Sequence, residues 1–355
     1  MEMSYDFAVF IARMQPPHQA HIKILEKALK TANRVIVILG SHRKAANLEN
    51  PWTSEQREQM VRICFPEAKD RLAFIPVRDH PYDNDAWLVE VQQKVKTLTE
   101  GSRSVVLIGH DKDKTSFYLK MFPQWKFVEV GQIDDDLSAT MIRDSYFGEN
   151  LWLEGDAPAV DFDWRNSVAS SVQIWLEEFR MTADFTNLLS EYEENHNYRQ
   201  RWKGTPFPVI FSTVDTVVVK SGHILLIRRR VAPGKGKLAL PGGFVNQEEW
   251  LFDSAVRELK EETRIKLDQR YLKDMVADQR TFDHPRRSTR GRTITHAFYI
   301  PLPSVIPPHG NELPEVRGDD DAERAMWIPL SDLRDREDEL FEDHFSIIQH
   351  FVGKL

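Results

Sequence analysis

Two histidines, His18 and His21, stand three residues apart just after the first apolar run of the chain, residues 7–12. The run is typical of a buried strand, and the two prolines that follow end it in a stiff turn. We expect a helix to begin near Gln19, which would point both imidazoles and their N–H donors the same way. The unpaired backbone N–H groups and positive dipole end of such a helix favour phosphate binding. Two surface histidines on an amphipathic helix would show the same spacing.

Three carboxylates share one face of a second predicted helix. Glu258, Glu261 and Glu262 have the spacing i, i+3, i+4 in a segment that predicts a helix over about 247–262, with Asn246 as its N-cap. Like-charge repulsion on an exposed helix costs only about 0.2–0.5 kcal/mol per pair, so a solvated acidic face would also explain the spacing. Carboxylate oxygens are, however, the ligands that Mg²⁺ and Mn²⁺ prefer.

The elements that must hold these residues differ between the two halves of the chain. In the first half, apolar runs typical of strands recur about every thirty residues, at 7–12, 35–40, 72–76, 105–109 and 127–130. Helical spacing lies between them, which predicts α/β architecture with βαβ units in a doubly wound parallel sheet. The two histidines would then lie at the carboxyl end of a strand, where open α/β sheets bind their ligands.

The second half of the chain has another rhythm. Two strands, at about 209–219 and 224–228, are expected to form a hairpin across Ser221-Gly222. Further strands are expected at 293–300 and 325–328, with the one strong helix between. This pattern predicts an α+β domain with a mixed sheet.

A change in composition marks the boundary between the halves. Residues 191–203 contain no aliphatic side chain, and glycine and proline follow directly. At roughly 100–200 residues per domain, a chain of 355 residues predicts two domains. We therefore expect a first domain at 1–190, a linker at 191–206 and a second domain at 207–355.

Composition and charge restrict the class of protein. The chain is 41% hydrophobic, as expected of globular domains, and its net charge of −8 argues against general nucleic-acid binding. Its single cysteine, Cys64, excludes an internal disulfide and a cysteine-rich zinc site. The longest apolar run is far too short for a membrane helix, and the N-terminus lacks a basic signal region. We expect a cytoplasmic protein with no nucleic-acid or membrane partner; the sequence leaves homo-oligomerisation open.

The histidine segment resembles the signature of the HxGH nucleotidyltransferases, and most closely that of the archaeal-type nicotinamide-mononucleotide (NMN) adenylyltransferases, roughly GRxQPxHxGH. The matching residues are Arg13, Gln15, Pro16, His18 and His21. The chain departs at Ala12 and Ala20, where the family prefers glycine and an added methyl could crowd the nucleotide. The resemblance implies a Rossmann-like nucleotidyltransferase fold for the first domain.

Four further segments resemble this family in the same order along the chain. They are 50–53 with Arg57, 83–87, 109–113 and 138–143. The resemblance implies that Trp87 stacks on the nicotinamide and that Asn84 pairs with its amide. It also implies substrate contacts from a loop after a strand and from a helix start, at Gly109, Asp111, Lys112, Ser138 and Thr140.

The reaction implied by this resemblance transfers AMP from ATP to NMN and yields NAD and pyrophosphate. The NMN phosphate attacks the α-phosphate in line, so the protein mainly positions the substrates and neutralises charge. The neutralising groups would be a bound Mg²⁺, with Mn²⁺ as the alternative, and the side chains of Arg13, His18, His21 and Arg143. The Arg143 guanidinium suits bidentate contacts to phosphate oxygens. This half shows no compact acidic metal cage, which suits a metal ion held largely by substrate phosphates.

The carboxylate helix resembles the Nudix box, Gx5Ex7REUxEExGU, in which U is aliphatic. The matching residues are Gly243, Glu249, Arg257, Glu258, Leu259, Glu261, Glu262 and Ile265. Arg264 replaces the final glycine, which ends the helix where a positive φ is often needed, at a cost on the order of 1 kcal/mol. The resemblance implies that Glu258, Glu261 and Glu262, helped by the Gly243 carbonyl, bind Mg²⁺ or Mn²⁺ and that the metal activates water.

A basic segment follows the box and is expected to select the substrate. Residues 280–292 carry five arginines and one aspartate. A solvated basic face would explain this composition, but beside an acidic metal site the arginines could clamp a diphosphate. The candidates are Arg280, Arg286, Arg287 and Arg290. The segment resembles the corresponding region of ADP-ribose pyrophosphatases and of Nudix regulators of NAD metabolism, and Glu323 is a candidate for a further carboxylate.

Over nearly its whole length the chain resembles bifunctional NMN adenylyltransferase/Nudix proteins. The implied substrates are ATP, NMN and ADP-ribose, the last hydrolysed to AMP and ribose 5-phosphate, with Mg²⁺ or Mn²⁺ in both domains. Two alternatives stay open. The first half could adenylylate another phosphate monoester, and the Nudix half could be a non-catalytic sensor of ADP-ribose-type ligands.

Overall fold

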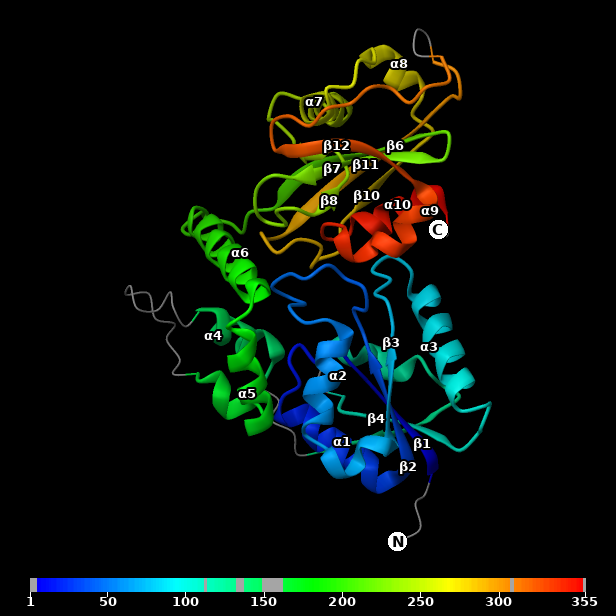
Figure 1. Cartoon of the computed structure of the whole chain (residues 1–355), viewed down its shortest axis with the longest axis vertical. Helices are drawn as coiled ribbons and strands as arrows, with labels where there is room; N and C mark the ends of the chain where they lie inside the picture. The colour runs from blue at the N-terminus through cyan, green and yellow to red at the C-terminus, as the bar shows by residue number, and fades with distance from the viewer. Residues whose placement is uncertain (1–4, 112–113, 132–136, 149–161, 307–309, 354–355) are drawn as a thin grey trace. The chain divides into compact units, whose positions relative to one another are not determined.

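The structure is a computed structural model that describes residues 5–353 apart from 112–113, 132–136, 149–161 and 307–309. It contains two compact units, Met1–Tyr192 and Glu193–Leu355 (Figure 1). Helix α6 (Ala183–Gln200) therefore passes through the unit boundary and through the first part of the segment expected as a linker. No helix in the described part of the chain is both long and apolar enough to cross a membrane.

The first unit is built on a five-stranded parallel sheet in the order β3-β2-β1-β4-β5. Its strands are β1 (Tyr5–Ala12), β2 (Ala32–Leu39), β3 (Leu72–Pro76), β4 (Val105–Gly109) and β5 (Lys126–Glu129). The predicted doubly wound parallel sheet is thus confirmed, and each predicted run corresponds to one strand. Because the order reverses between β1 and β4, their carboxyl ends form the switch point at which such sheets bind ligands.

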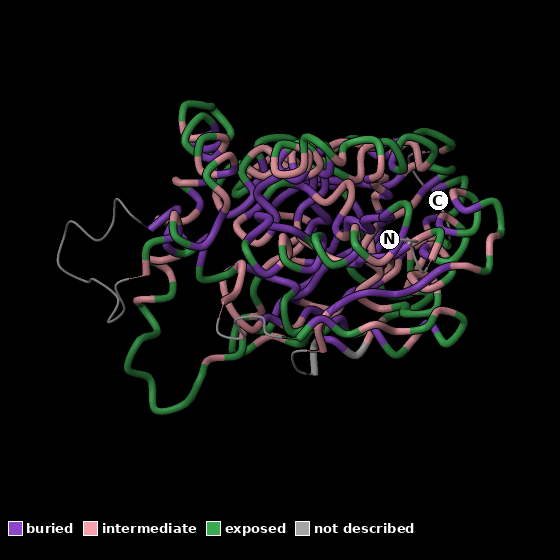
Figure 2. Tube along the Cα trace, turned by 90° about the horizontal axis from the view of Figure 1, so that it is seen from below, coloured by how far each residue is buried: buried purple, intermediate pink, exposed green. Residues whose placement is uncertain are grey.

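Both faces of this sheet are covered, which explains its continuous apolar runs. Alternate residues of β1 enter different clusters: Phe10 packs in one with Leu25 of α1, and Val9 packs in another with Val91 of α3. Figure 2 shows the buried stretches of chain enclosed by intermediate and exposed ones. The helices of this unit besides α6 are α1 (Gln19–Thr31), α2 (Ser54–Arg62), α3 (Asn84–Leu98), α4 (Ala139–Gly148) and α5 (Ser170–Phe179).

The second unit contains a mixed sheet, as predicted; the sheet has seven strands, of which β8, β9 and β10 were not predicted, and its central order is β10-β11-β6-β7-β12. β11 and β6 are parallel, whereas the other neighbours are antiparallel. The predicted hairpin is present, with Ser221 and Gly222 at positive φ between β6 and β7. The strands are β6 (Phe211–Lys220), β7 (His223–Arg229), β8 (Leu238–Ala239), β9 (Gly242–Phe244), β10 (Asp278–Phe282), β11 (Thr293–Leu302) and β12 (Ala322–Pro329).

Helix α7 (Leu251–Thr263) packs its apolar face, including Ala255 and Leu259, on this sheet. The predicted N-cap at Asn246 is wrong: the helix begins four residues later than predicted, with Trp250 as its N-cap. The Asn246 amide instead donates to Glu249, at the end of a turn that precedes the helix. The other helices of the unit are α8 (Gln269–Asp274), α9 (Leu330–Leu333) and α10 (His344–Val352).

Candidate active sites

The turn after β1 is held in place by a buried arginine. Arg57 on α2 is 0% exposed, and its Nη1 donates to the carbonyls of Arg13 and Gly40, at 2.6 and 2.7 Å. Met14 takes a left-handed conformation with φ 54°. Arg57, which resembles a family residue together with segment 50–53, thus ties the carboxyl ends of β1 and β2 together.

The two histidines of the signature lie against each other at the start of α1, as predicted. Their ring centroids are 3.8 Å apart, with an interplanar angle of 34°. The backbone N–H of His18 donates to Nδ1 of His21 at 3.2 Å, so the proton of a neutral His21 sits on Nε2. Burial lowers the pKa of His21 to about 4. Near pH 7 this ring is therefore an uncharged donor at a helix N-terminus.

Asp79, which was not predicted as a site residue, holds Arg13, the arginine of the histidine signature. Arg13 is exposed, and its Nη2 lies 3.8 Å from Oδ2 of Asp79, beyond the end of β3. Asp79 also accepts hydrogen bonds from the backbone N–H and hydroxyl of Ser41, after β2. Although burial raises the pKa of Asp79, Arg13, Lys44 and Ser41 together hold it below its usual value. The position of Asp79 just after an apolar run was the available signal.

Arg143 on α4 is buried and binds backbone carbonyls. Its Nε donates to Leu48 at 2.9 Å and its Nη1 to Gln15 at 2.7 Å, while Nη2 lies 3.3 Å from the hydroxyl of Thr140. Ser138 accepts a hydrogen bond from the backbone N–H of residue 141 and so begins the helix, as expected. Arg143 thus joins the start of α4, in the predicted segment 138–143, to the turn after β1.

The residues expected at the nicotinamide end lie at the start of α3. Asn84 is exposed, and the Trp87 ring forms T-shaped contacts with Tyr118 and Phe122, with centroids 6.3 and 5.7 Å apart. The Tyr118 hydroxyl donates to the Ile11 carbonyl in β1 at 3.4 Å. Trp87 is therefore half-buried in an aromatic cluster that reaches the end of β1.

The loop after β4 holds the remaining predicted residues of this unit. Gly109 ends the strand, and a Cβ there would lie 3.0 Å from a methyl of Leu119. Asp111 forms an ion pair with Lys120, whose Nζ lies 2.9 Å from its Oδ2. Lys112 lies outside the described residues.

In the second unit, the box carboxylates line a cavity of about 230 Å³. The acidic residues around it are Asp215, Glu258, Glu261, Glu262, Asp320, Asp321 and Glu342. Glu323, which was predicted as a further carboxylate of the site, is exposed on β12 and does not line the cavity. Asp320 and Asp321 belong to a run of three aspartates in the sequence, at 319–321. The sequence signal for Asp215 was a charged residue inside an otherwise apolar strand.

Glu262 is the most deeply buried carboxylate of the box, with 3% of its surface exposed. One of its oxygens accepts the backbone N–H of Gly242 at 2.9 Å. Burial raises the pKa of Glu262 to about 8, and the neighbouring Glu258 adds to the shift. Burial also raises the pKa of Glu258 above its usual value. Nearby positive charge would therefore strongly stabilise the ionised forms of these two carboxylates.

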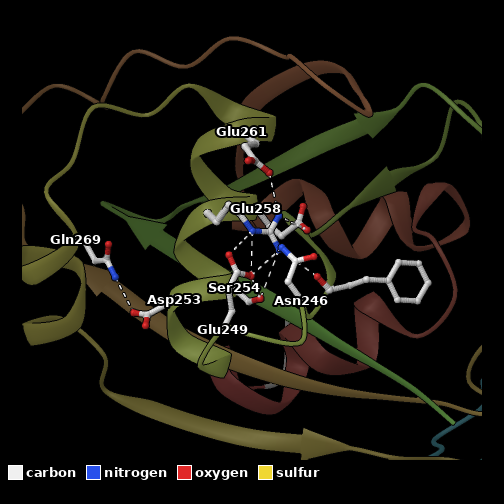
Figure 3. A network of polar contacts seen from close by, with 9 residues as sticks. Asn246, Glu249, Asp253, Ser254, Glu258, Glu261 and Gln269 are labelled. Carbon is white, nitrogen blue, oxygen red and sulfur yellow. Dashed lines mark hydrogen bonds and ion pairs between the residues drawn. The ribbon is translucent and has the colours of Figure 1, made fainter.

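Arg257 is the centre of a polar network, because its guanidinium donates to Glu249, Ser254, Glu258 and Glu261. These four side chains are labelled in Figure 3. Its Nε lies 2.8 Å from Glu249, and its Nη1 lies 2.8 Å from Glu258 and 3.0 Å from Glu261. The Ser254 hydroxyl donates to Glu249 as well. Arg257 therefore organises the acidic face that the box spacing predicted.

The two glycines before the helix are required by close contacts. A Cβ on Gly243 would lie 2.5 Å from an oxygen of Glu258, and one on Gly242 would lie 2.2 Å from the carbonyl oxygen of Val214. A side chain at position 242 would push the turn away from the neighbouring strand, and one at position 243 would displace the carboxylate of Glu258. The turn thus brings the Gly243 backbone directly beside Glu258.

The four candidate arginines are not all in one place. Arg287 and Arg290 line the cavity, whereas Arg280 and Arg286 are absent from its described lining. Arg287 is buried and binds Asp343 through both ends of the guanidinium, at 3.0 and 2.9 Å. Arg290 lies over the ring of Phe244, 5.1 Å from its centroid. Arg280 instead binds His350 on α10, and Arg286 is exposed.

The chemistry of the cavity fits a hard divalent cation. Its donors are carboxylate oxygens, and Oε1 of Glu342 is buried with no hydrogen-bond partner in the described part of the chain. Within that part, no three His, Cys, Asp or Glu side chains already converge closely enough to hold a metal ion. Since Arg257 binds Glu258 and Glu261, these two carboxylates must turn from it before they can serve as ligands.

Comparisons with known proteins agree with the division into two units. Residues 9–145 match the cytidylyltransferase-like family and residues 209–351 match the NUDIX domain family. The chain is 38% identical over 144 residues to the nicotinamide/nicotinic acid mononucleotide adenylyltransferase of Acinetobacter baylyi, a match covering 40% of this chain and 76% of that protein. It is 34% identical over 139 residues to the ADP-ribose pyrophosphatase of Methanocaldococcus jannaschii, covering 39% and 71%.

Two crystal structures from Francisella tularensis resemble the whole chain. Both are of a bifunctional NMN adenylyltransferase/ADP ribose pyrophosphatase. One is 31% identical with a TM-score of 0.87 and covers 99% of each chain. The other, complexed with AMP and a manganese ion, is 30% identical with a TM-score of 0.85 and covers 98% of each chain.

Proposed function

This chain belongs to the family of bifunctional NMN adenylyltransferase/ADP-ribose pyrophosphatase proteins, and from that premise we propose that each unit performs one reaction at the residues described above. The first domain, residues 1–190, transfers AMP from ATP to NMN. An oxygen of the NMN phosphate attacks the α-phosphorus of ATP, and the bond from that phosphorus to the β-phosphate oxygen breaks. The products are NAD and pyrophosphate.

The side chains of the first domain hold and neutralise the phosphates. His18 and His21 offer N–H donors at the start of α1, that of His21 from an uncharged ring, and the exposed guanidinium of Arg13, held by Asp79, supplies positive charge. Arg143, which contacts Thr140 and the Gln15 carbonyl, keeps the start of α4 beside the turn after β1. A divalent cation arriving with the phosphates of ATP would add charge to the same place.

At the other end of this site, Trp87 and Asn84 bind the nicotinamide. The T-shaped contacts with Tyr118 and Phe122 hold the ring of Trp87 in place, so its orientation is fixed before the nicotinamide binds. The exposed amide of Asn84 can pair with the carboxamide of the base. This pair favours NMN over phosphate monoesters that lack an aromatic ring with a carboxamide.

The second domain, residues 207–355, hydrolyses ADP-ribose, with 191–206 connecting the two domains. A water oxygen adds to one phosphorus of the diphosphate, the bond to the bridging oxygen breaks, and AMP and ribose 5-phosphate are formed. Mg²⁺ or Mn²⁺, held by Glu258, Glu261, Glu262 and the Gly243 carbonyl, would supply positive charge and make water a stronger acid. Arg290 contacts the diphosphate, and Arg287 supports the wall of the cavity through Asp343.

The observation that carries this proposal is the convergence of the box carboxylates and two of the predicted arginines on one cavity. A sensor would need the cavity but not the three intact carboxylates. ATP, NMN and ADP-ribose are thus the proposed small-molecule partners. We also propose, as the sequence predicts, a cytoplasmic protein without nucleic-acid or membrane partners. Homo-oligomerisation stays open.

One experiment tests both activities in the same preparation. The purified chain is incubated with Mg²⁺ and either ATP plus NMN or ADP-ribose, and the products are separated by chromatography. We expect NAD in the first case and AMP in the second. Trp87→Ala should raise the KM for NMN at least tenfold, and Glu262→Gln should reduce AMP formation by at least a hundredfold.

Each variant serves as the control for the other domain. Trp87→Ala should hydrolyse ADP-ribose at the parental rate, and Glu262→Gln should form NAD at the parental rate. An unchanged KM for NMN in Trp87→Ala would contradict the proposed nicotinamide site. Binding of ADP-ribose without hydrolysis by the parent chain would replace the hydrolase with a sensor.

A further inference from the structure

A histidine outside the box, His344, is held firmly in the wall of the second cavity. It is the first residue of α10 and is 6% exposed. The ring of Phe341 packs against it at 72°, with centroids 5.5 Å apart. Its Nδ1 lies 2.9 Å from the backbone nitrogen of Leu240, just before the glycine turn of the box. His344 therefore connects α10 to the turn that positions Glu258 and Glu262.

This contact decides which ring nitrogen carries the proton. A backbone N–H can only donate, so Nδ1 of His344 must be the acceptor. A neutral His344 then carries its hydrogen on Nε2. The nearest carboxylate to Nε2 is Oδ1 of Asp215 at 3.8 Å, which is beyond hydrogen-bond distance. The other oxygen of Asp215 already accepts the hydroxyl of Thr295 at 2.6 Å.

The Nε2–H of His344 is a hydrogen-bond donor in a cavity lined by many acidic residues. His344 lines the same cavity as Gly242, Glu262 and the acidic residues named above, which would repel an anionic diphosphate. Two of the arginines in the lining, Arg257 and Arg287, are already bound to carboxylates. Besides Arg229 and Arg290, which also line the cavity, the Nε2–H of a neutral His344 can donate to a phosphate oxygen, because Asp215 at 3.8 Å is too far to accept its hydrogen bond.

We propose that His344 is a substrate-binding residue of the second domain, whose Nε2–H donates a hydrogen bond to an oxygen of the diphosphate. The proposal rests on the proposed hydrolysis of ADP-ribose. The Leu240 N–H sets the tautomer, so the donor is ready before the substrate arrives. Asp215, at 3.8 Å, limits the directions in which the ring can turn.

The test compares two variants that separate the functions of the two ring nitrogens. His344→Asn keeps a side-chain oxygen near the position of Nδ1, where it can accept the Leu240 N–H, but has no donor at the position of Nε2. His344→Gln reaches that position with an amide N–H. We expect kcat/KM for ADP-ribose to fall roughly 10- to 100-fold in His344→Asn and to recover in part in His344→Gln. NAD formation by both variants should equal that of the parent chain.

Parental kcat/KM in His344→Asn would overturn the proposal. So would equal losses in both variants accompanied by a lower unfolding temperature, since that pattern means that the ring only supports the fold. ADP-ribose binding is measured by calorimetry in parallel. If the parent chain binds without hydrolysis, the hydrolase proposal fails alone: weaker binding by His344→Asn then supports the donor, and equal binding overturns it.

Discussion

At the scale of single residues, the sites depend on side chains that burial drives toward their uncharged forms. His21 is a base whose pKa falls to about 4, and Glu262 is an acid whose pKa rises to about 8. Both are held by backbone N–H groups, those of His18 and Gly242. A neutral His21 keeps its ring nitrogens as one donor and one acceptor, whereas a protonated Glu262 stores a proton that a cation would displace.

Glu262 should make the stability of the second unit depend on pH. The folded chain keeps this proton to about pH 8, whereas an unfolded glutamate loses it near pH 4.5. The folded state therefore binds more protons between these values, and its extra stability is present below pH 4.5 and lost as pH rises to 8. We expect the free energy of unfolding of metal-free protein to fall by roughly 4 kcal/mol across this window.

Glu262→Gln is the matched control for this pH dependence, because the amide oxygen can still accept the Gly242 N–H but does not titrate. Urea unfolding in the presence of a chelator, at pH 5 and at pH 8, measures the difference. A decline with pH that is as steep in Glu262→Gln as in the parent would assign the dependence to other groups.

At the scale of elements, the end of α7 carries a local strain that the sequence pattern predicted. Arg264 stands where the box pattern has glycine and takes the left-handed conformation, with φ 53° and ψ 22°. Its side chain is 54% exposed and pairs with Asp319 at 2.6 Å. An exposed ion pair contributes little, so it offsets only part of the backbone cost.

Arg264→Gly should therefore stabilise the second unit. Relief of a left-handed non-glycine residue is worth about 1 kcal/mol, less a few tenths for the ion pair, which corresponds to an increase of roughly 2 °C in Tm. Arg264→Ala loses the ion pair and keeps the strain, so its Tm should fall below that of the parent. Differential scanning calorimetry of the three proteins checks the order, and a Tm for Arg264→Gly below that of Arg264→Ala would contradict it.

At the scale of the whole molecule, each unit has hydrophobic clusters of its own. Those of the first unit lie on the two faces of the parallel sheet and around Trp52 and Trp164, and the main cluster of the second lies between α7 and the mixed sheet. Unfolding of one unit therefore need not expose the core of the other.

Calorimetry should accordingly resolve two unfolding transitions. Arg57→Ala removes the buried guanidinium that ties β1 and β2 together, and should lower one transition by several degrees, because it leaves buried carbonyls unpaired. Arg264→Ala should lower the other. A single transition that both substitutions shift equally would mean that the two units unfold cooperatively.

The sequence was enough to predict local patterns and the chemistry that they carry. The apolar runs, the hairpin at Ser221-Gly222 and the histidine pair all follow from neighbours along the chain, because periodicity and turn chemistry act over a few residues. The start of α7 was predicted wrongly at Asn246, since the contacts of Glu249 with Arg257 extend the preceding turn.

Contacts between distant segments followed only from the folded arrangement. Asp79 meets Arg13 because the ends of β1 and β3 share one edge of a sheet, and Asp215 and His344 reach the box cavity from β6 and α10. The same folding separates Arg280 from Arg290, although they are ten residues apart in one basic segment. Spacing along the chain indicates which residues share a strand or helix face, but pairing and packing choose which faces meet.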